Sequence, residues 1–229
     1  MFKLFIANKN YSSWSLRPWV LMRELRIPFE EKLVPFGRAG EPSAFFAFSP
    51  TGKVPCLVEG STVVWDSLAI TEFLAERVHT VWPGDSVARA WARCAAAEMH
   101  SGFSTLRDIC TMNCGIRVRI DPYPAVLLRE WARMDDLWND GLARFGGPFL
   151  AGETFTAVDA FFAPVAFRVQ TYEPALSARS REYVNRLLAL PSMQEWYLAA
   201  LSEPWRDETH EDEAHRAGVW LQDLRHVPT

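Results

Sequence analysis

The chain has 229 residues, of which 49% are hydrophobic and 23% are charged, and its formal net charge at pH 7 is −4. This composition is typical of a globular protein, and the acidic balance argues against a nucleic-acid partner, which usually requires a basic patch. No apolar run reaches the ~18 residues of a membrane-spanning helix, and the apolar stretch in MFKLFIANKN is too short for a secretory signal, so we expect a cytoplasmic protein without a membrane partner.

The first part of the chain predicts a strand, a helix and a second strand. Phe2–Ala7 is expected to form the first strand and Leu16–Leu25 an amphipathic helix. Pro18 fits the first turn of that helix, because its missing N–H costs nothing there. Phe29–Val34 carries charged residues at its centre, which indicates an edge strand, and a short helix is expected at Ser43–Phe48. The residues expected on the solvent side of the first helix are Arg17, Arg23, Glu24 and Arg26.

The most informative stretch is SPTGKVPCLV at residues 49–58. Proline is confined to the starts and edges of strands, because it donates no hydrogen bond. Pro55 at the start of a strand therefore indicates that the backbone of Val54 is free to pair with a peptide laid alongside it. A cis bond between these two residues would mark a deliberate turn, since cis X-Pro bonds are a small minority in folded proteins.

A second strand follows a turn at Gly60, and the sequence WDSLAI at 65–70 then opens a helix that is expected to end near Arg77. Asp66 and Ser67 stand at the N-terminus of this helix, where backbone N–H groups bind carboxylates well. The two residues are therefore placed to meet the far end of the peptide.

The run HTVWPGDS at 79–86 is the best candidate for a domain boundary, because Pro-Gly is followed by polar turn residues. We expect one domain at residues 1–80 and a second at 87–229. The tail from residue 203 is strongly charged until Val219–Leu221, which is apolar enough to pack back on the body. The segments with helical spacing are Val87–Ile109, Pro124–Arg144, Ala157–Phe167, Arg181–Leu190 and Ser192–Leu201.

The strand–loop–helix around NKNYSSWSLRPW at 8–19, together with the two motifs above, resembles the glutathione-binding half of the glutathione transferases. The pattern Ser-Ser-x-Ser-x-Arg at 12–17 is most similar to the Ser-type, zeta (maleylacetoacetate isomerase) branch, in a bacterial-type enzyme. The zeta pattern has Cys where this chain has Trp14. The resemblance implies a thioredoxin-like α/β N-terminal domain (β-α-β-α-β-β-α) and an all-α helical C-terminal domain. It also implies glutathione as co-substrate, a small electrophile as second substrate, and a homodimer.

Ser12 and Ser13 are the candidate catalytic residues. They follow a strand and precede a helix, which places them at the positive end of a helix dipole. A thiol there ionises more easily, because a hydroxyl donor and the dipole both favour the thiolate. The serines alone would suit a simple helix cap, but the other two motifs favour the catalytic interpretation. Aligned on Arg17, Ser12 takes the place of the zeta hydroxyl that contacts the thiol, with Ser13 and the phenol of Tyr11 as alternatives.

The resemblance also implies which residues bind glutathione. Val54 and Pro55 match the step that pairs with the peptide, and Lys53 is placed to meet a carboxylate. Ser67 would offer its N–H and hydroxyl to the γ-glutamyl carboxylate, and Asp66 would face the γ-glutamyl ammonium. An ordinary strand start and an ordinary helix cap are the alternatives for these two motifs.

The second substrate is expected over the thiol, in a pocket formed by Tyr11, Trp14, the loop at 36–42 and the segment 103–123. An acidic electrophile would suit the arginines of that segment, unless they are simply solvated: Arg107, Arg117 and Arg119. Three phenylalanines in the loop after the second strand fit either an anchor into the partner subunit or closure of the chain's own core: Phe45, Phe46 and Phe48.

Two pairs of potential metal ligands are not expected to bind a metal. Cys110 and Cys114 have i,i+4 spacing, but no matching pair of histidines follows to complete a zinc site. His210 and His215 are five residues apart, so they diverge by about 140° on a helix. Thr156 and Asp159, by contrast, resemble a capping box that supports the helical domain, and we interpret them as structural.

These features predict an enzyme of detoxification that activates glutathione as a thiolate, for addition to a small electrophile or for its cis–trans isomerisation. One alternative is a glutathione-dependent thiol oxidoreductase, which requires a cysteine at the helix start, where this chain has Ser-Ser-Trp-Ser. Another is a catalytically idle, transferase-like stress or interaction protein. The intact Ser12, Pro55 and Ser67 argue against this last reading.

Overall fold

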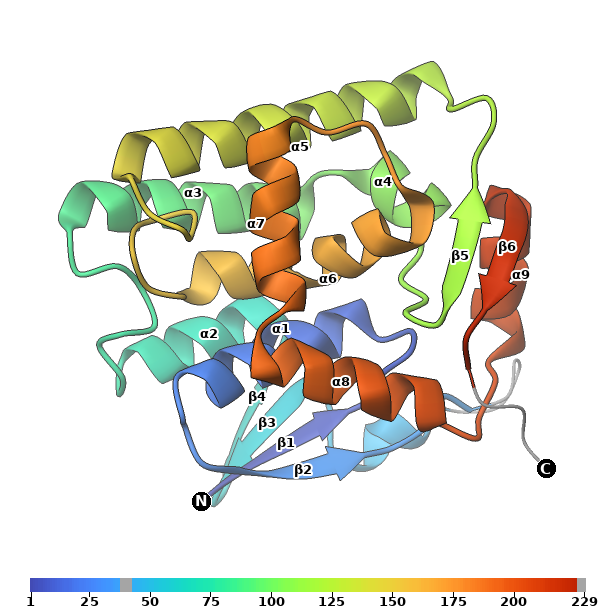
Figure 1. Cartoon of the computed structure of the whole chain (residues 1–229). Coiled ribbons are helices and arrows are strands. Elements are labelled where there is room, and N and C mark those ends of the chain that lie inside the picture. Colours follow the sequence, from blue (N-terminus) through green and yellow to red (C-terminus); the bar gives the residue numbers. More distant parts are fainter. Residues whose placement is uncertain (38–42, 226–229) are drawn as a thin grey trace.

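The computed structural model describes residues 1–37 and 43–225 (Figure 1). Its first part contains a sheet in the order β2-β1-β3-β4, in which β1 and β2 run parallel and the other two pairs are antiparallel. As its charged residues predict, β2 lies at the edge of this sheet. The strands are β1 (Phe2–Ile6), β2 (Phe29–Leu33), β3 (Cys56–Glu59) and β4 (Thr62–Trp65).

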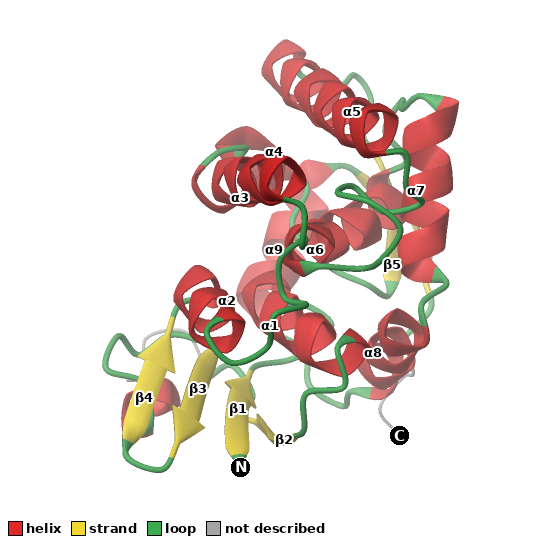
Figure 2. Ribbon diagram, turned by 90° about the vertical axis from the view of Figure 1, so that its left-hand side faces the viewer, coloured by secondary structure: helices red, strands yellow, loops and turns green. Residues whose placement is uncertain are grey.

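Two helices, α1 (Ser13–Glu24) and α2 (Ser67–Ala75), lie together on one face of the sheet, as Figure 2 shows. Leu4 and Ile6 of β1 are fully buried, which follows from the alternation of side chains along a strand. Between β2 and β3 a short 3-10 helix, η1 (Ala44–Ala47), stands in the place of a longer helix. The element order is otherwise the predicted thioredoxin-like one.

The rest of the described chain is mostly helical and lies on the other side of α1 and α2 from the sheet (Figure 2). Helix α6 is at its centre, with almost every residue buried, and packs against α1, α3 and α7. Because α6 is covered on all sides, apolar residues occur around its whole circumference, and its buried charged residues are Asp159 and Arg168. The helices are α3 (Ser86–Ser101), α4 (Ser104–Ile109), α5 (Ala125–Phe145), α6 (Ala157–Tyr172), α7 (Ala178–Leu188), α8 (Pro191–Ser202) and α9 (Glu208–Ala217).

The helical part also contains a small antiparallel sheet that the resemblance does not imply. Strand β5 (Ile116–Arg119) pairs with β6 (Val219–Asp223), so the tail packs back on the body, as predicted. Of the predicted apolar run, Trp220 packs against the core, whereas the side chains of Val219 and Leu221 stay exposed. Within residues 1–37 and 43–225, no helix has the length and apolarity needed to cross a membrane.

Helix α1 departs from the prediction in two respects. It begins at Ser13, earlier than predicted, so Pro18 lies inside the helix and not in its first turn. Arg17 is buried, and its predicted exposure is wrong, because α6 covers α1. The guanidinium carbon of Arg17 lies 4.1 Å from the ring centre of Trp14 and 4.9 Å from that of Phe161 on α6. An arginine that is sandwiched between aromatic rings satisfies its charge by cation–π contacts.

The loop between α2 and α3 runs from the end of α2 at Ala75 to the start of α3 at Ser86. We propose that this loop is the boundary between the domains 1–80 and 87–229. The two parts are closely packed, since α1 and α2 on one side meet α6 and α3 on the other (Figure 2).

Candidate functional site

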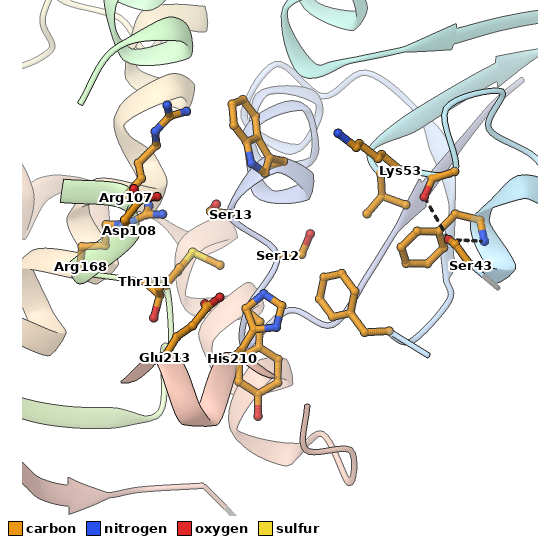
Figure 3. A pocket seen from close by; sticks show the side chains of 17 residues that line it. Ser12, Ser13, Ser43, Lys53, Arg107, Asp108, Thr111, Arg168, His210 and Glu213 are labelled. Atoms are coloured by element: carbon orange, nitrogen blue, oxygen red, sulfur yellow. Dashed lines mark hydrogen bonds between the residues drawn. The ribbon is translucent and has the colours of Figure 1, made fainter. Parts of the chain in front are cut away.

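Two adjoining cavities lie at the start of α1. The larger is formed by the sheet domain and the helical part together, whereas the smaller is lined by the sheet domain alone. The larger, of about 550 Å³, is shown in Figure 3, and the smaller has a volume of about 420 Å³. Trp14, Lys53 and Val54 line both cavities. Ser12 and Ser13, the predicted catalytic pair, line the larger one.

The smaller cavity is surrounded by the residues that the sequence predicts to bind a peptide, namely Lys53, Val54, Pro55, Asp66 and Ser67. The Val54–Pro55 bond is cis, and the pairing of the sheet begins only at Cys56. Among the described residues, no backbone hydrogen bond involves Val54. Its N–H and C=O are therefore available to an extended peptide that pairs with it as an added strand.

The N-terminus of α2 forms the far end of the smaller cavity. Asp66 caps the helix with a positive φ of 74°, and its carboxylate accepts a hydrogen bond from Leu68 N at 2.7 Å. The same carboxylate is about half exposed (45%) and lies 3.6 Å from Nε2 of His100 on α3. Ser67 begins the helix and is fully buried, with its Oγ accepting from Nη1 of Arg17 at 3.4 Å. The site thus presents a carboxylate for a cation and a helix N-terminus for an anion.

Three arginines lie near one another beside the start of α1, namely Arg17, Arg107 and Arg168. Of these, only Arg107 belongs to the predicted pocket segment. Arg17 makes no ion pair with a carboxylate among the described residues, and its buried Nε has no hydrogen-bond partner there. Burial, together with repulsion from Arg168 and Arg107, lowers the pKa of Arg17 to about 9. Arg107 and Arg168 both line the larger cavity, which also receives the acidic side chains of Asp108 and Glu213. The two arginines offer donors for an anionic group.

Ser12 is buried at the residue just before α1 and belongs to a short chain of hydrogen bonds. Its hydroxyl donates to Oγ of Ser15 at 2.7 Å, and the same Oγ accepts from the backbone N–H of Ala7 at 3.2 Å. Ser12 is therefore held between the end of β1 and the first turn of α1. Its side chain faces the larger cavity in Figure 3, where Ser13 lies nearby as the first residue of the helix.

Tyr11, the third candidate for thiol activation, has a hydroxyl that is engaged elsewhere. It donates to Oε1 of Glu211 at 2.6 Å and accepts from Nη1 of Arg225 at 3.2 Å. Burial raises the pKa of Tyr11 well above its usual value, and the Glu211 carboxylate adds to this increase. The phenol is therefore tied to the C-terminal tail, whereas its ring lines the larger cavity.

The walls of the larger cavity agree in part with the predicted pocket. Phe36 lines it at the start of the predicted loop 36–42, of which residues 38–42 lie outside the described part of the chain. Two of the predicted arginines do not line the larger cavity. Arg117 donates to the backbone oxygen of Ile116, and Arg119 lines a separate cavity. The contributions of the predicted segment 103–123 are Arg107, Asp108, Thr111 and Met112.

Helix α9 supplies a wall that the sequence analysis did not predict, because His210 and Glu213 line the larger cavity. The sequence contains one local sign of this placement. Asp207 stands three positions before His210, at the N-cap of a charged helix, where a short acidic side chain reaches back to the first turn. The fold alone shows that this helix lies against the cavity.

Models of two protein domains match most of the chain: "Glutathione S-transferase, N-terminal domain" over residues 11–77 and "Glutathione S-transferase, C-terminal domain" over residues 85–199. The chain belongs to the glutathione S-transferase family. The predicted thioredoxin-like fold with a mostly helical second part is thereby confirmed. Glutathione is the co-substrate, in keeping with the glutathione-bound structures among its structural neighbours.

Several relatives of this transferase cover most of its length. The glutathione S-transferase-like protein OpS6 of Beauveria bassiana is 25% identical over 191 residues, which are 76% of this chain and 83% of that protein. A zeta-class glutathione S-transferase of Euphorbia esula is 28% identical over 52% of this chain and 55% of its own. The crystal structure of a glutathione transferase homolog from Burkholderia GL BGR1, with bound glutathione, has a TM-score of 0.64 at 23% identity and covers 87% of this chain and 97% of that one.

The buried cysteines of this transferase do not resemble redox-active thiols. Cys110 and Cys114 are fully buried and free. Burial raises the pKa of Cys110 to about 12 and that of Cys114 still higher, so both remain thiols at neutral pH. The two histidines of α9 have separate partners, since His210 contacts Asp207 and His215 stacks on Trp220 with ring centres 3.9 Å apart.

Proposed function

We propose that this transferase activates glutathione as a thiolate and uses it in a Ser-type, zeta-like site, for addition to a small electrophile or for its isomerisation. The observation that carries the proposal is the junction of the two cavities at the start of α1. A peptide that pairs with Val54 in the smaller cavity extends toward Ser12 in the larger one. The sulfur would then lie where one cavity opens into the other.

In the proposed complex, Val54 pairs with the backbone of glutathione through its N–H and C=O. Ser67 and the N-terminus of α2 bind the γ-glutamyl carboxylate, and the half-exposed Asp66 faces the γ-glutamyl ammonium. Lys53, which lines both cavities, meets the second carboxylate. These contacts bind the peptide ends and leave the thiol free for the second substrate.

The Ser12 hydroxyl is proposed to stabilise the thiolate. To donate to sulfur it turns away from Ser15, and Ser15 can then donate to the Ser12 oxygen, since a hydroxyl is both donor and acceptor. The thiol proton leaves to solvent, and the N-terminus of α1 favours the negative charge. A thiol of pKa ~8.5 is mostly protonated at pH 7, so lowering the pKa by two units, worth roughly 2.7 kcal/mol, makes it a nucleophile.

The nature of the electrophile is proposed from the charges around the larger cavity. Arg107 and Arg168 line it, and both suit an acidic substrate of the kind that the zeta resemblance implies. Trp14 stands in the position of the zeta cysteine and lines both cavities. A bulky indole at that position narrows the space over the sulfur, which favours conjugation of a flat substrate over zeta-type isomerisation.

Replacing Ser12 and Ser67 separately should affect two different steps. Ser12→Ala should raise the pKa of bound glutathione by a unit or more, at roughly 1.4 kcal/mol per unit for the lost charge-assisted bond, without a marked change in affinity. The ultraviolet absorbance of the thiolate, followed against pH in the enzyme–glutathione complex, measures this shift. Ser13→Ala is the matched control and should be mild. If the pKa of bound glutathione shifts in Ser13→Ala alone, then Ser13 and not Ser12 activates the thiol. If it shifts in neither variant, the proposal of a Ser-type site is refuted.

Ser67→Ala should weaken glutathione binding by about ten- to a hundredfold, because a hydrogen bond to a charged group is worth roughly 1.5–3 kcal/mol. The thiolate pKa should stay the same in the residual complex. Calorimetric titration with glutathione measures the affinity, and an unchanged affinity would remove Ser67 from the site. A wild-type chain that binds glutathione without ionising it would instead support the idle, transferase-like protein.

We also propose a homodimer, as the family resemblance implies, and a cytoplasmic location, as the sequence analysis expects. Of the three phenylalanines considered as an anchor, Phe45 is buried, and Phe48 stacks on Phe5 with ring centres 4.1 Å apart. Phe46, by contrast, is 65% exposed. Phe46 is therefore the side chain left for a partner subunit. Solution scattering at micromolar concentration should give the mass of a dimer, and Phe46→Ala should shift it toward the monomer. The control Trp205→Ala, at another exposed aromatic, should not. A wild-type monomer would contradict the proposal.

A further inference from the structure

The structure assigns a second catalytic group to the larger cavity: we propose that His210, held by Asp207, donates a proton to the electrophile as the thiolate adds to it. This inference rests on the proposed function and names a group in the tail that the resemblance does not include. The two matched family domains cover residues 11–77 and 85–199, so both residues lie beyond them.

Asp207 fixes one side of the imidazole. Its Oδ1 lies 2.6 Å from Nδ1 of His210 and also accepts from the backbone N–H of His210 at 3.1 Å. The Asp207 side chain is only 14% exposed and that of His210 is 27% exposed. A carboxylate at this distance accepts a hydrogen bond from Nδ1, which leaves Nε2 as the nitrogen that can exchange a proton with a substrate.

Two aromatic rings hold the imidazole at the cavity. Its ring centre lies 5.1 Å from that of Tyr11, in a stacked arrangement, and 4.9 Å from that of Phe36. The imidazole and the Ser12 hydroxyl, which is proposed to bind the sulfur, therefore border the same cavity. Figure 3 shows both His210 and Ser12 at the cavity that they line.

Capping of α9 alone would explain the contact between Asp207 and the backbone of His210, since acidic residues are common N-caps. It does not explain why the ring is stacked into the cavity. Among the described residues, Nε2 of His210 has no hydrogen-bond partner. A ring nitrogen at a cavity that makes no hydrogen bond within the described protein is available to a substrate, and a general acid must lie within hydrogen-bond reach of the substrate.

The proposed step concerns an α,β-unsaturated carbonyl. The glutathione thiolate forms a C–S bond at the β-carbon, the electron pair of the C=C bond moves toward the carbonyl, and the oxygen becomes an enolate. The Nε2–H of the His210 imidazolium gives its proton to that oxygen, and the resulting enol tautomerises to the product. The neutral imidazole then takes a proton from solvent. Displacement of chloride from an aromatic ring differs, because the thiolate replaces a chloride ion and no proton is consumed.

Two probe electrophiles therefore separate this role from a structural one. With 4-phenyl-3-buten-2-one, His210→Phe should lower kcat/KM by about 100-fold, within the range of general acid catalysis. With 1-chloro-2,4-dinitrobenzene the same variant should keep its activity. The thiolate titration of bound glutathione should also be unchanged. Phenylalanine retains the stacking on Tyr11 and Phe36, and Asp207→Asn should reproduce part of the loss. His215→Phe, on the same helix but stacked on Trp220, should change neither reaction.

An equal loss with both probes would mean that His210 only shapes the wall, and it would overturn the inference. Unchanged activity with the enone, or a shift of the thiolate titration in His210→Phe, would overturn it as well. A wild-type chain that conjugates the aromatic chloride but not the enone would refute the inference and leave the proposed function standing. If the wild type neither ionises bound glutathione nor conjugates either probe, the proposed function fails, and the inference fails with it.

Discussion

Replacing Asp159 by alanine should lower the free energy of unfolding by about 3–5 kcal/mol, because it leaves several buried donors without an acceptor. The predicted capping box is present at the start of α6, where Thr156 N donates to Oδ2 of Asp159 at 3.0 Å. The other oxygen accepts from Leu150 N at 3.1 Å and from the hydroxyl of Tyr183 at 3.0 Å. Asp159 is fully buried, so no water replaces these contacts.

The carboxylate joins three parts of the helical domain: the loop before α6, α6 itself and α7. Burial raises the pKa of Asp159 to about 6, against the opposing effect of its hydrogen bonds, so the group is ionised at neutral pH. An ionised acceptor strengthens each bond. The Asp159 carboxylate therefore stabilises the position of the start of α6 relative to the preceding loop and α7.

Urea denaturation followed by circular dichroism measures the effect. Tyr183→Phe removes the hydroxyl that donates to Asp159 and should lower the free energy of unfolding by roughly 1.5–3 kcal/mol. This variant can still be measured if Asp159→Ala does not fold. Asp136→Ala, at an exposed position on α5, is the control and should change stability by less than about 0.5 kcal/mol. A loss in Asp159→Ala no larger than that of the control would contradict a structural role for the box.

Arg225→Ala should release the C-terminal tail from the body, at a cost of about 3 kcal/mol for the loss of several charge-assisted hydrogen bonds to partly exposed carboxylates. The Arg225 side chain is only 2% exposed. Its Nη2 lies 2.9 Å from Oε2 of Glu211 and its Nε 2.8 Å from Oδ1 of Asp223, while Nη1 donates to the hydroxyl of Tyr11. The guanidinium thus joins α9, β6 and the loop that carries Ser12.

Hydrogen exchange, read by mass spectrometry, locates the effect. The protection of α9 and β6 should fall by about 100-fold or more, while that of α6 should change much less. Arg216→Ala replaces an exposed arginine of α9 and is the matched control. Because α9 carries His210, the released tail should also lower activity toward the enone. Unchanged exchange in α9 and β6 would show that the strand pairing alone holds the tail.

Local patterns in the sequence determined the order of the elements and the position of the cavity that we propose for the peptide. The Val54–Pro55 step is recognised from a proline at the start of a strand. Asp66–Ser67 is recognised from capping residues before an apolar helix. Thr156 and Asp159 likewise read directly as a capping box. Each of these features involves residues a few positions apart, whose geometry follows from the backbone that they themselves form.

The remaining parts of the site depend on contacts between distant segments, and only the tertiary structure decided them. Arg17 meets His100, 83 positions away, and Tyr11 meets Glu211, 200 positions away. Helical spacing assigned Arg17 to the solvent side of α1, because it considers one partner surface, the sheet, and not the second surface that α6 provides. The charged sequence of α9 shows an exposed helix, yet the Arg225 contacts bring its His210 to the cavity beside Ser12. Periodicity predicts which face of an element is buried, but the identity of the neighbour arises only when the chain packs.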